Sequence, residues 1–296
     1  VTVTVSLGEG SQGDSWTFSI YNDGYDPATG MPIASARELY DTFFGETASR
    51  SLTRNFYLSA DIALGEYANW QGIPKGFTGH FDGKGHTISG LDVDVVESSG
   101  SQGYGFFLGL SENAVVENLK LEGNVKYQVF MADAINNGVS NGVAALAQSM
   151  SGGIIRNVLI DVDVQTNAEF NAPVVAHMTG GQILNSISLG SMSGIDGAPV
   201  VAPGDRPGWA PFTFGAFAGK IDSASCSVTG CYALGAPSAN LGFTNRADGS
   251  GEIGGVQNSG FKTEEELKTG TDIYADYDTN IWNIVSGEIP SLKVQA

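Results

Sequence analysis

The chain has 296 residues and a net charge of −18, from 32 acidic and 14 basic side chains. Such a surface repels phosphate groups, which argues against nucleic acid and anionic membrane surfaces as partners. No apolar run reaches the ~18 residues of a membrane-spanning helix, so we expect no membrane insertion, and 41 glycines among alternating Val, Ile and Leu predict short strands and tight turns.

Residues 1–32 are expected to form a strand or linker segment of their own. The first five, VTVTV, alternate as a strand does. They lack the basic region and the long apolar region of a signal peptide. We therefore expect a mature form or an excised fragment of a larger chain.

Two capping boxes predict short helices towards the two ends of the chain. Ser35 with Glu38 predicts a helix over roughly 36–44, and Thr263 with Glu266 predicts a second one. A glycine-rich region with strand signals lies between them. Because a stack of strands exposes its core at both ends, we interpret the two helices and their flanks as caps.

The most informative segment is Phe77–Leu91, FTGHFDGKGHTISGL, which places turn residues between short apolar runs. A weaker repeat follows, anchored by Asn118, Asn157, Asn185 and Gly230, which are 39, 28 and 45 residues apart. Asparagine and glycine tolerate the left-handed conformation of a sharp corner, and an asparagine amide can bond to the neighbouring coil. Irregular spacing suits a solenoid, because each coil contacts only its neighbours and insertions leave as loops.

The order of these motifs resembles a known family of repeats. Four segments follow one another: Asp61–Leu64, Phe77–Leu91, Gly105–Gly109 and Val116–Leu121. This order resembles the Gly-Leu-Gly-type repeat region of large bacterial surface proteins. It is similar to the non-catalytic N-terminal part of immunoglobulin-A-specific metallopeptidases and to adhesin-like β-helix modules. The tail Ile281–Leu292 also resembles the closing segment of such regions, and the match covers roughly residues 33–125 and 261–293.

The resemblance implies an all-β fold, a right-handed parallel β-helix with short helical caps at both ends. We expect this β-helix, with its N-terminal cap helix and corner loops, over residues 33–260. The C-terminal cap helix and a closing strand then occupy residues 261–296.

His80, Asp82, Lys84 and His86 form the densest group of titratable residues. One interpretation is an acid–base or metal pair. The preferred one is a turn with solvated or backbone-capping side chains, because the same pattern recurs in proteins without a common activity. Zinc-peptidase chemistry needs two histidines four residues apart on a helix. No histidine of this chain stands in such a motif, so we predict no protease activity and no metal site.

Aspartates also flank valines on two predicted strands, as Asp92/Asp94 and Asp161/Asp163. A period of two points the carboxylates outwards and Val93 and Val162 inwards. Stacked carboxylates could bind a cation or serve a glycosidase. The preferred interpretation is that outward acids keep the sheet soluble.

Two further features stay open. Cys226 and Cys231 could form a local disulfide or remain two buried thiols. No cofactor is expected, apart from calcium at two acid-rich loops that both lack the spacing of an EF-hand: Asn22–Asp26, and the group Asp272, Asp276 and Asp278.

Aligning the coils on their anchors gathers the long connections at one corner, over 96–103, 126–141, 165–172, 193–213 and 236–251. Loops that leave one corner of successive coils stack into a wall. Aromatic, acidic and arginine side chains are typical of sugar or peptide grooves. The predicted ligand-binding residues are therefore Tyr127, Phe130, Phe170, Arg206, Trp209, Phe212 and Arg246. The candidate catalytic acids are Asp133, Glu169 and Asp205. Alternatively, the aromatic side chains fold back to cover the flank of the solenoid.

These observations predict a non-catalytic β-helix module of a bacterial secreted or cell-surface protein. It would act as an adhesive or stalk domain beside further domains of a larger chain, with a glycan or a host or cell-surface protein as ligand. The alternative is a carbohydrate-active enzyme that uses acids of the loop wall. Within that class a glycoside hydrolase is preferred over a polysaccharide lyase, because the negative charge would repel an anionic polymer.

Overall fold

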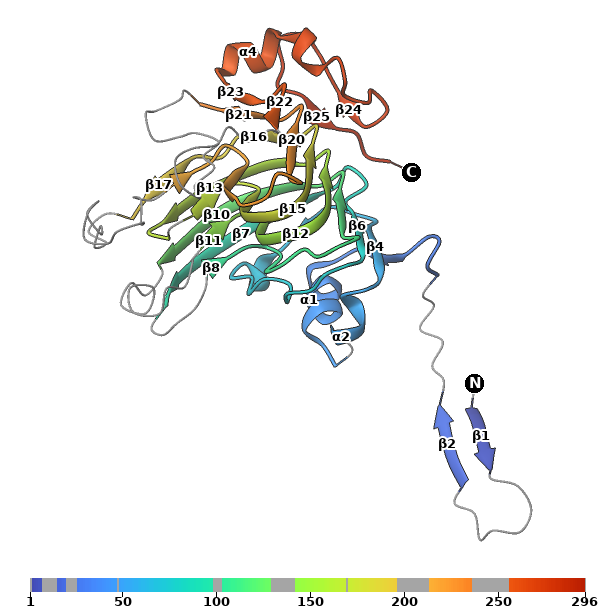
Figure 1. The fold of residues 1–296 in the computed structure, drawn as a ribbon. Coiled ribbons are helices and arrows are strands. Elements are labelled where there is room, and N and C mark those ends of the chain that lie inside the picture. Colours follow the sequence, from blue (N-terminus) through green and yellow to red (C-terminus); the bar gives the residue numbers. More distant parts are fainter. Residues whose placement is uncertain are drawn as a thin grey trace.

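The computed structural model describes residues 2–6, 15–19, 26–46, 48–97, 103–128, 142–168, 170–195, 213–235 and 256–295. Most of their secondary structure is β-strand, and three parallel sheets run through the body of the protein (Figure 1). The predicted all-β class with parallel strands is confirmed. The strand order is consistent with a parallel solenoid, because neighbouring strands within each sheet come from successive coils.

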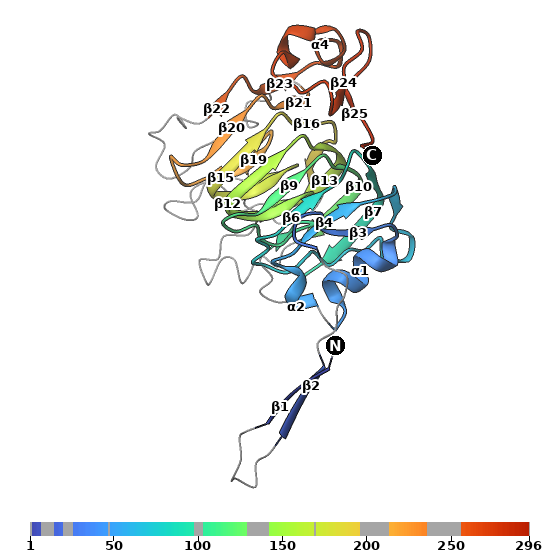
Figure 2. The ribbon, with the colours of Figure 1, turned by 90° about the vertical axis from the view of Figure 1, so that its right-hand side faces the viewer.

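The first sheet carries the candidate site described below. Its strands lie side by side in Figure 2. They are β3 (Met31–Ile33), β4 (Asn55–Leu58), β6 (His80–Asp82), β9 (Val115–Glu117), β12 (Ala147–Arg156), β15 (Val175–Leu184), β20 (Ser227–Thr229) and β22 (Val256–Gln257), with β19 (Ala218–Ile221) paired to β15.

The other two sheets complete each coil. The second contains β5 (Ile62–Ala63), β7 (Thr87–Val96), β10 (Lys120–Gln128), β13 (Leu159–Thr166), β16 (Ile187–Ser188), β21 (Tyr232–Leu234) and β23 (Gly260–Lys262), with β17 (Met192–Gly194) paired to β13. The third contains β8 (Gly103–Tyr104), β11 (Gly142–Ala144), β14 (Phe170–Ala172) and β18 (Thr213–Phe214). Antiparallel pairs form between β1 (Thr2–Ser6) and β2 (Ser15–Ser19), and between β24 (Trp282–Asn283) and β25 (Ser291–Leu292).

The core is built from columns of like residues. Phe81 of β6 pairs in register with Val116 of β9, which in turn pairs with Ile155 of β12. All three side chains are buried. Because strand side chains alternate, their sequence neighbours point outwards. The same alternation leaves the carboxylates of Asp92/Asp94 and Asp161/Asp163 exposed around buried Val93 and Val162, as predicted.

Both helices that the capping boxes predicted are present. Helix α1 (Ala36–Phe44) begins after Ser35, whose hydroxyl accepts the Glu38 N–H, and helix α4 (Glu264–Thr269) begins with a complete capping box at Thr263. In Figure 1, α1 and α2 (Ala48–Ser51) lie at one end of the stack of coils and α4 lies at the other. Two short 3₁₀ helices span Gly65–Tyr67 and Thr271–Tyr274.

The anchor residues occupy the left-handed corner that the repeat predicted. The backbone φ is +53° at Asn118, +52° at Asn157, +46° at Asn185 and +65° at Gly230. Asn258 has the same conformation, with φ of +47°, and marks a further corner that the sequence reading missed.

A second apolar cluster lies outside the solenoid. On β13 and β16, Leu159 and Ile187 point away from the inner core and pack with Leu267 of α4, Tyr277 and Trp282. The outer face of the second sheet is therefore apolar where the C-terminal residues cover it.

Cys226 and Cys231 are free, buried thiols. Of the two alternatives, a local disulfide or two buried thiols, the structure shows the buried thiols. In the described part of the chain, no helix combines the length and the apolar character needed to cross a membrane.

Candidate functional site

An open groove lies on the outer face of the first sheet, over β4 and β6. Because Phe56 and Phe81 point into the core, the residues on either side of them point into the groove. The cavity has a volume of about 750 Å³. It is lined by Ala28, Thr29, Asn55, Phe56, Tyr57, Leu58, Ser59, His80, Asp82, Lys84, His86, Val294 and Gln295.

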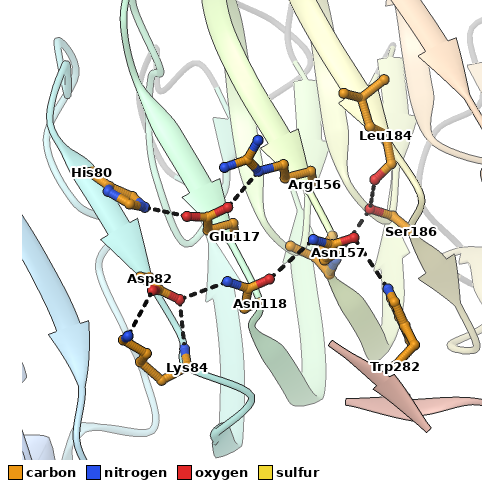
Figure 3. Close-up of polar contacts among 11 residues, drawn as sticks. His80, Asp82, Lys84, Glu117, Asn118, Arg156, Asn157, Leu184, Ser186 and Trp282 are labelled. Atoms are coloured by element: carbon orange, nitrogen blue, oxygen red, sulfur yellow. Dashed lines mark hydrogen bonds and ion pairs between the residues drawn. The ribbon is translucent and has the colours of Figure 1, made fainter. Parts of the chain in front are cut away.

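A group of charged side chains crosses neighbouring coils (Figure 3), and two of its members, His80 and Asp82, line this groove. His80 Nε2 lies 2.6 Å from Glu117 Oε1, and Arg156 Nε donates to Glu117 Oε2 at 2.5 Å. The register produces this arrangement, since Asp82 pairs with Glu117 and Glu117 pairs with Arg156 on successive strands. Three polar outer positions are thus stacked in one column.

The Glu117 carboxyl is held in its ionised form. Burial by itself would raise its pKa, but hydrogen bonds from His80 and Arg156, together with their charges, outweigh burial and lower the pKa to about 2. Its side chain is only 9% exposed. At neutral pH this group cannot donate a proton, so it does not suit the role of a general acid.

Asp82 begins a second polar column at the corner, which we call the corner ladder: Asp82, Asn118 and Asn157. Asp82 Oδ1 accepts hydrogen bonds from the Lys84 N–H at 2.8 Å and from Asn118 Nδ2 at 3.0 Å. Asn157 Nδ2 then donates to Asn118 Oδ1 at 3.1 Å. Each asparagine therefore turns the chain and bonds to the next coil, which is the role predicted for the anchors.

The C-terminal strap, defined as residues 271–295, runs along the same corner. The Tyr277 hydroxyl donates to the Gly230 carbonyl at 2.8 Å, and Trp282 Nε1 donates to Asn157 Oδ1 at 3.2 Å. At its far end the Gln295 N–H donates to the Lys84 carbonyl at 2.8 Å. The strap thus reaches from the last coils back to the Asp82 turn beside the groove.

The Asp82-Gly-Lys-Gly turn leaves room for this strap because a glycine stands at position 85. Gly85 has a φ of +80°, and a Cβ there would lie 2.0 Å from the Lys293 carbonyl oxygen. Any side chain at position 85 would therefore push the strap away. The glycine is required both for the turn and for the contact with the strap.

All three histidines of the sequence pair with a carboxylate of a neighbouring coil. His86 Nδ1 lies 3.0 Å from Asp61 Oδ1, and His177 Nε2 lies 2.7 Å from Asp222 Oδ2. The pKa of Asp61 is lowered chiefly by the N–H of Thr87. At Asp222, burial opposes ionisation, but bonds from Lys220 and His177 still lower the pKa.

One group in the described part of the chain has the composition of a metal site. His80, Asp82 and Glu117 each offer a ligand atom, and these atoms lie within 4.8 Å of one another. Sequence reasoning had included His80 and Asp82 in its titratable cluster but missed Glu117. Only the register of β6 with β9 brings Glu117 to them.

The two predicted ligand-binding residues of the loop wall that the structure describes are buried. Tyr127 is 4% exposed and its hydroxyl donates to Glu97 Oε1, while Phe170 is 2% exposed and lies 4.8 Å below Lys220 Nζ. In this structure, neither ring is exposed to a ligand. The other predicted residues lie outside the described part of the chain: Phe130, Asp133, Glu169, Asp205, Arg206, Trp209, Phe212 and Arg246.

At the two predicted calcium loops, one acid in each serves a turn. Asp26 Oδ1 accepts the Ala28 N–H at 2.9 Å, and Asp278 Oδ1 accepts the Asn280 N–H at 2.8 Å. Calcium binding there stays a prediction.

No family model matches the chain, and no curated protein matches it. Among solved structures, it is similar to the crystal structure of a candidate immunoglobulin A1 protease from Bacteroides ovatus. The identity is 14% and the TM-score 0.44, over 90% of this chain and 92% of that chain. No repeat family is confirmed.

Proposed function

We propose that this chain is a non-catalytic module of a bacterial secreted or cell-surface protein, a right-handed parallel β-helix closed by helical caps. It acts as a stalk-like support, and it binds a glycan in the groove over β4 and β6. The observation that carries this proposal is the groove itself, whose polar side chains are fixed in place by hydrogen bonds between coils.

The support role rests on how the coils are joined. Columns of buried side chains join each coil to the next, and the corner ladder adds a row of side-chain hydrogen bonds. The C-terminal strap then bonds to several coils at once. A solenoid bound along its length resists bending and local opening, which suits a domain that carries other domains.

Glycan binding rests on the composition of the groove. Sugar-binding sites combine an aromatic face with a few fixed donors and acceptors. Tyr57 supplies the ring, Asn55 an amide, and Asp82 and Lys84 charged groups. Because Asp82 is already oriented by Asn118, little side-chain freedom would be lost on binding.

The hydrolase remains the alternative proposal, with Asp133, Glu169 and Asp205 as its candidate acids. The carboxylates beside the groove do not favour it. Glu117 is ionised and paired on both oxygens, whereas a glycosidase needs one carboxylic acid with a raised pKa.

A glycan array tests the proposed function. Wild-type protein should bind a defined set of glycans, Tyr57→Ala should lose that binding at least tenfold, and Lys126→Ala should keep it. Lys126 is a suitable control because it lies on the outer face of the second sheet, paired with Asp94. Absence of binding to every glycan, or equal binding by Tyr57→Ala, would refute the glycan proposal.

A further inference from the structure

We propose that His80, Asp82 and Glu117 form a binding site for one divalent transition-metal ion of the zinc class. Its ligands lie on two adjacent coils, and two of them, His80 and Asp82, line the groove. The inference concerns the metal alone and does not depend on glycan binding.

Strand geometry brings the three ligands together. Residues 80 and 82 are two apart on β6, so both point to the outer face. Glu117 stands directly beside Asp82 on the next strand. Neighbouring strands are about 4.8 Å apart, and the three ligand atoms lie within 4.8 Å of one another.

The site needs little adjustment to hold an ion. Ligand atoms about 2.0–2.2 Å from a tetrahedral zinc are roughly 3.3 Å from each other. His80 Nε2 and Glu117 Oε1 are now 2.6 Å apart and hydrogen-bonded, so they must separate by less than an ångström. The ion takes the place of the hydrogen on Nε2, and His80 binds as the neutral imidazole with a hydrogen on Nδ1: an imidazolium releases one proton to solvent, and a neutral ring moves its hydrogen to Nδ1.

Outer groups already orient both carboxylates. The second oxygen of Glu117 accepts from Arg156, and Asp82 Oδ1 accepts from Asn118 and the Lys84 N–H. Orientation of ligands by such outer hydrogen bonds is a general property of metal sites. The charges of Arg156 and Lys84 oppose a cation, while the two carboxylates match the charge of a divalent ion.

The donor set favours zinc-class metals over calcium. Calcium takes six to eight oxygen ligands, whereas an imidazole nitrogen with two carboxylate oxygens suits zinc. His80 and Asp82 both line the groove. A fourth coordination position would therefore face the groove and be open to water or to a hydroxyl of a ligand.

The other histidine pairs lack this composition in the described part of the chain. His177 also bonds to a carboxylate, that of Asp222, but the third group there is Lys220, whose Nζ lies 2.9 Å from the same carboxylate. With one carboxylate, already paired with Lys220, that position lacks the second carboxylate that the proposed site has. His177→Ala is therefore a matched control for His80→Ala.

Calorimetric titration of ZnCl₂ into untagged, chelator-treated wild-type protein tests the site. One zinc ion should bind per chain, with an affinity at least tenfold higher than that for CaCl₂. His80→Ala and Asp82→Asn should each weaken zinc binding at least tenfold, and His177→Ala should change it less than twofold. Circular dichroism checks that each variant is folded, and His80→Gln replaces His80→Ala if the latter fails to fold.

Two results would overturn the proposal: no stoichiometric zinc binding by the wild type, or unchanged affinity in both folded His80 and Asp82 variants. Since no glycan is present in this titration, such a result would leave the glycan proposal untouched. Absence of glycan binding together with intact zinc binding would refute the glycan proposal and leave the zinc proposal untouched.

Discussion

Trp282 donates the hydrogen bond of its indole nitrogen to Asn157 Oδ1 at 3.2 Å, across 125 residues of sequence. Asn157 is itself bonded to Asn118, which is bonded to Asp82. A single polar row therefore connects the C-terminal strap to the turn beside the groove. The hydrogen bonds of this row link the strap to the site.

Replacing Trp282 should destabilise the whole solenoid. The side chain is fully buried, so Trp282→Ala should lower the free energy of unfolding by about 3–5 kcal/mol. Trp282→Phe keeps most of the packing and loses the hydrogen bond, for a cost of about 1–2 kcal/mol. Urea unfolding followed by circular dichroism measures both. If Trp282→Ala unfolds like the wild type, the strap does not stabilise the coils.

Asn118 should show the separate contributions of its amide and its backbone. Asn118→Gly keeps the positive φ but removes the bonds to Asp82 and Asn157, at a cost of about 1–3 kcal/mol. Asn118→Ala loses the same bonds but keeps a Cβ in the left-handed region, which should make it about 1–2 kcal/mol less stable than Asn118→Gly. Equal unfolding midpoints for the two variants would contradict the assigned role of the corner conformation.

Several features of the fold could be read from the sequence because they depend on local chemistry. The capping boxes at Ser35 and Thr263 and the corner asparagines Asn118 and Asn157 are of this kind. The strap contacts could not be read, since they join residues that are far apart in sequence. Gly85 shows this limit: its turn role was predictable, whereas its contact with Lys293 was not.

The site shows the same limit. His80 and Asp82 stood out in the sequence, but only the register of β6 with β9 identifies Glu117 as their partner. A glutamate just before an anchor asparagine is an ordinary outer residue until the neighbouring coil is known.

Stability should fall in acid because of Glu117. Its pKa is about 2 in the folded protein against the ordinary 4.5, so its stabilisation is present above pH 4.5 and is lost as the pH falls towards 2. The upper bound of this term is about 3 kcal/mol. Asp61 and Asp222, whose pKa values are also lowered, contribute with the same sign.

Urea titrations at several pH values between 7 and 2.5 measure this dependence. Glu117→Gln should be less stable than the wild type at pH 7, and the difference should shrink as the pH falls. A constant difference across this range would show that the charge of Glu117 is not the stabilising feature.

Both cysteines should be unreactive in the folded protein. Burial raises the pKa of Cys231 to about 12 and also raises that of Cys226, and the thiolate is the reactive form. Ellman's reagent at pH 8 should therefore detect almost no thiol in native protein and both thiols in urea. Fast labelling of native Cys226→Ser protein, in which Cys231 remains, would contradict the buried placement.

Hydrogen exchange with and without a glycan identified on the array tests the central claim most directly, because it locates the binding site. Glycan bound in the groove should add protection over residues 55–59 and 80–86, which line it. Protection confined to the loop wall, residues 96–103, 126–141, 165–172, 193–213 and 236–251, would contradict binding in the groove.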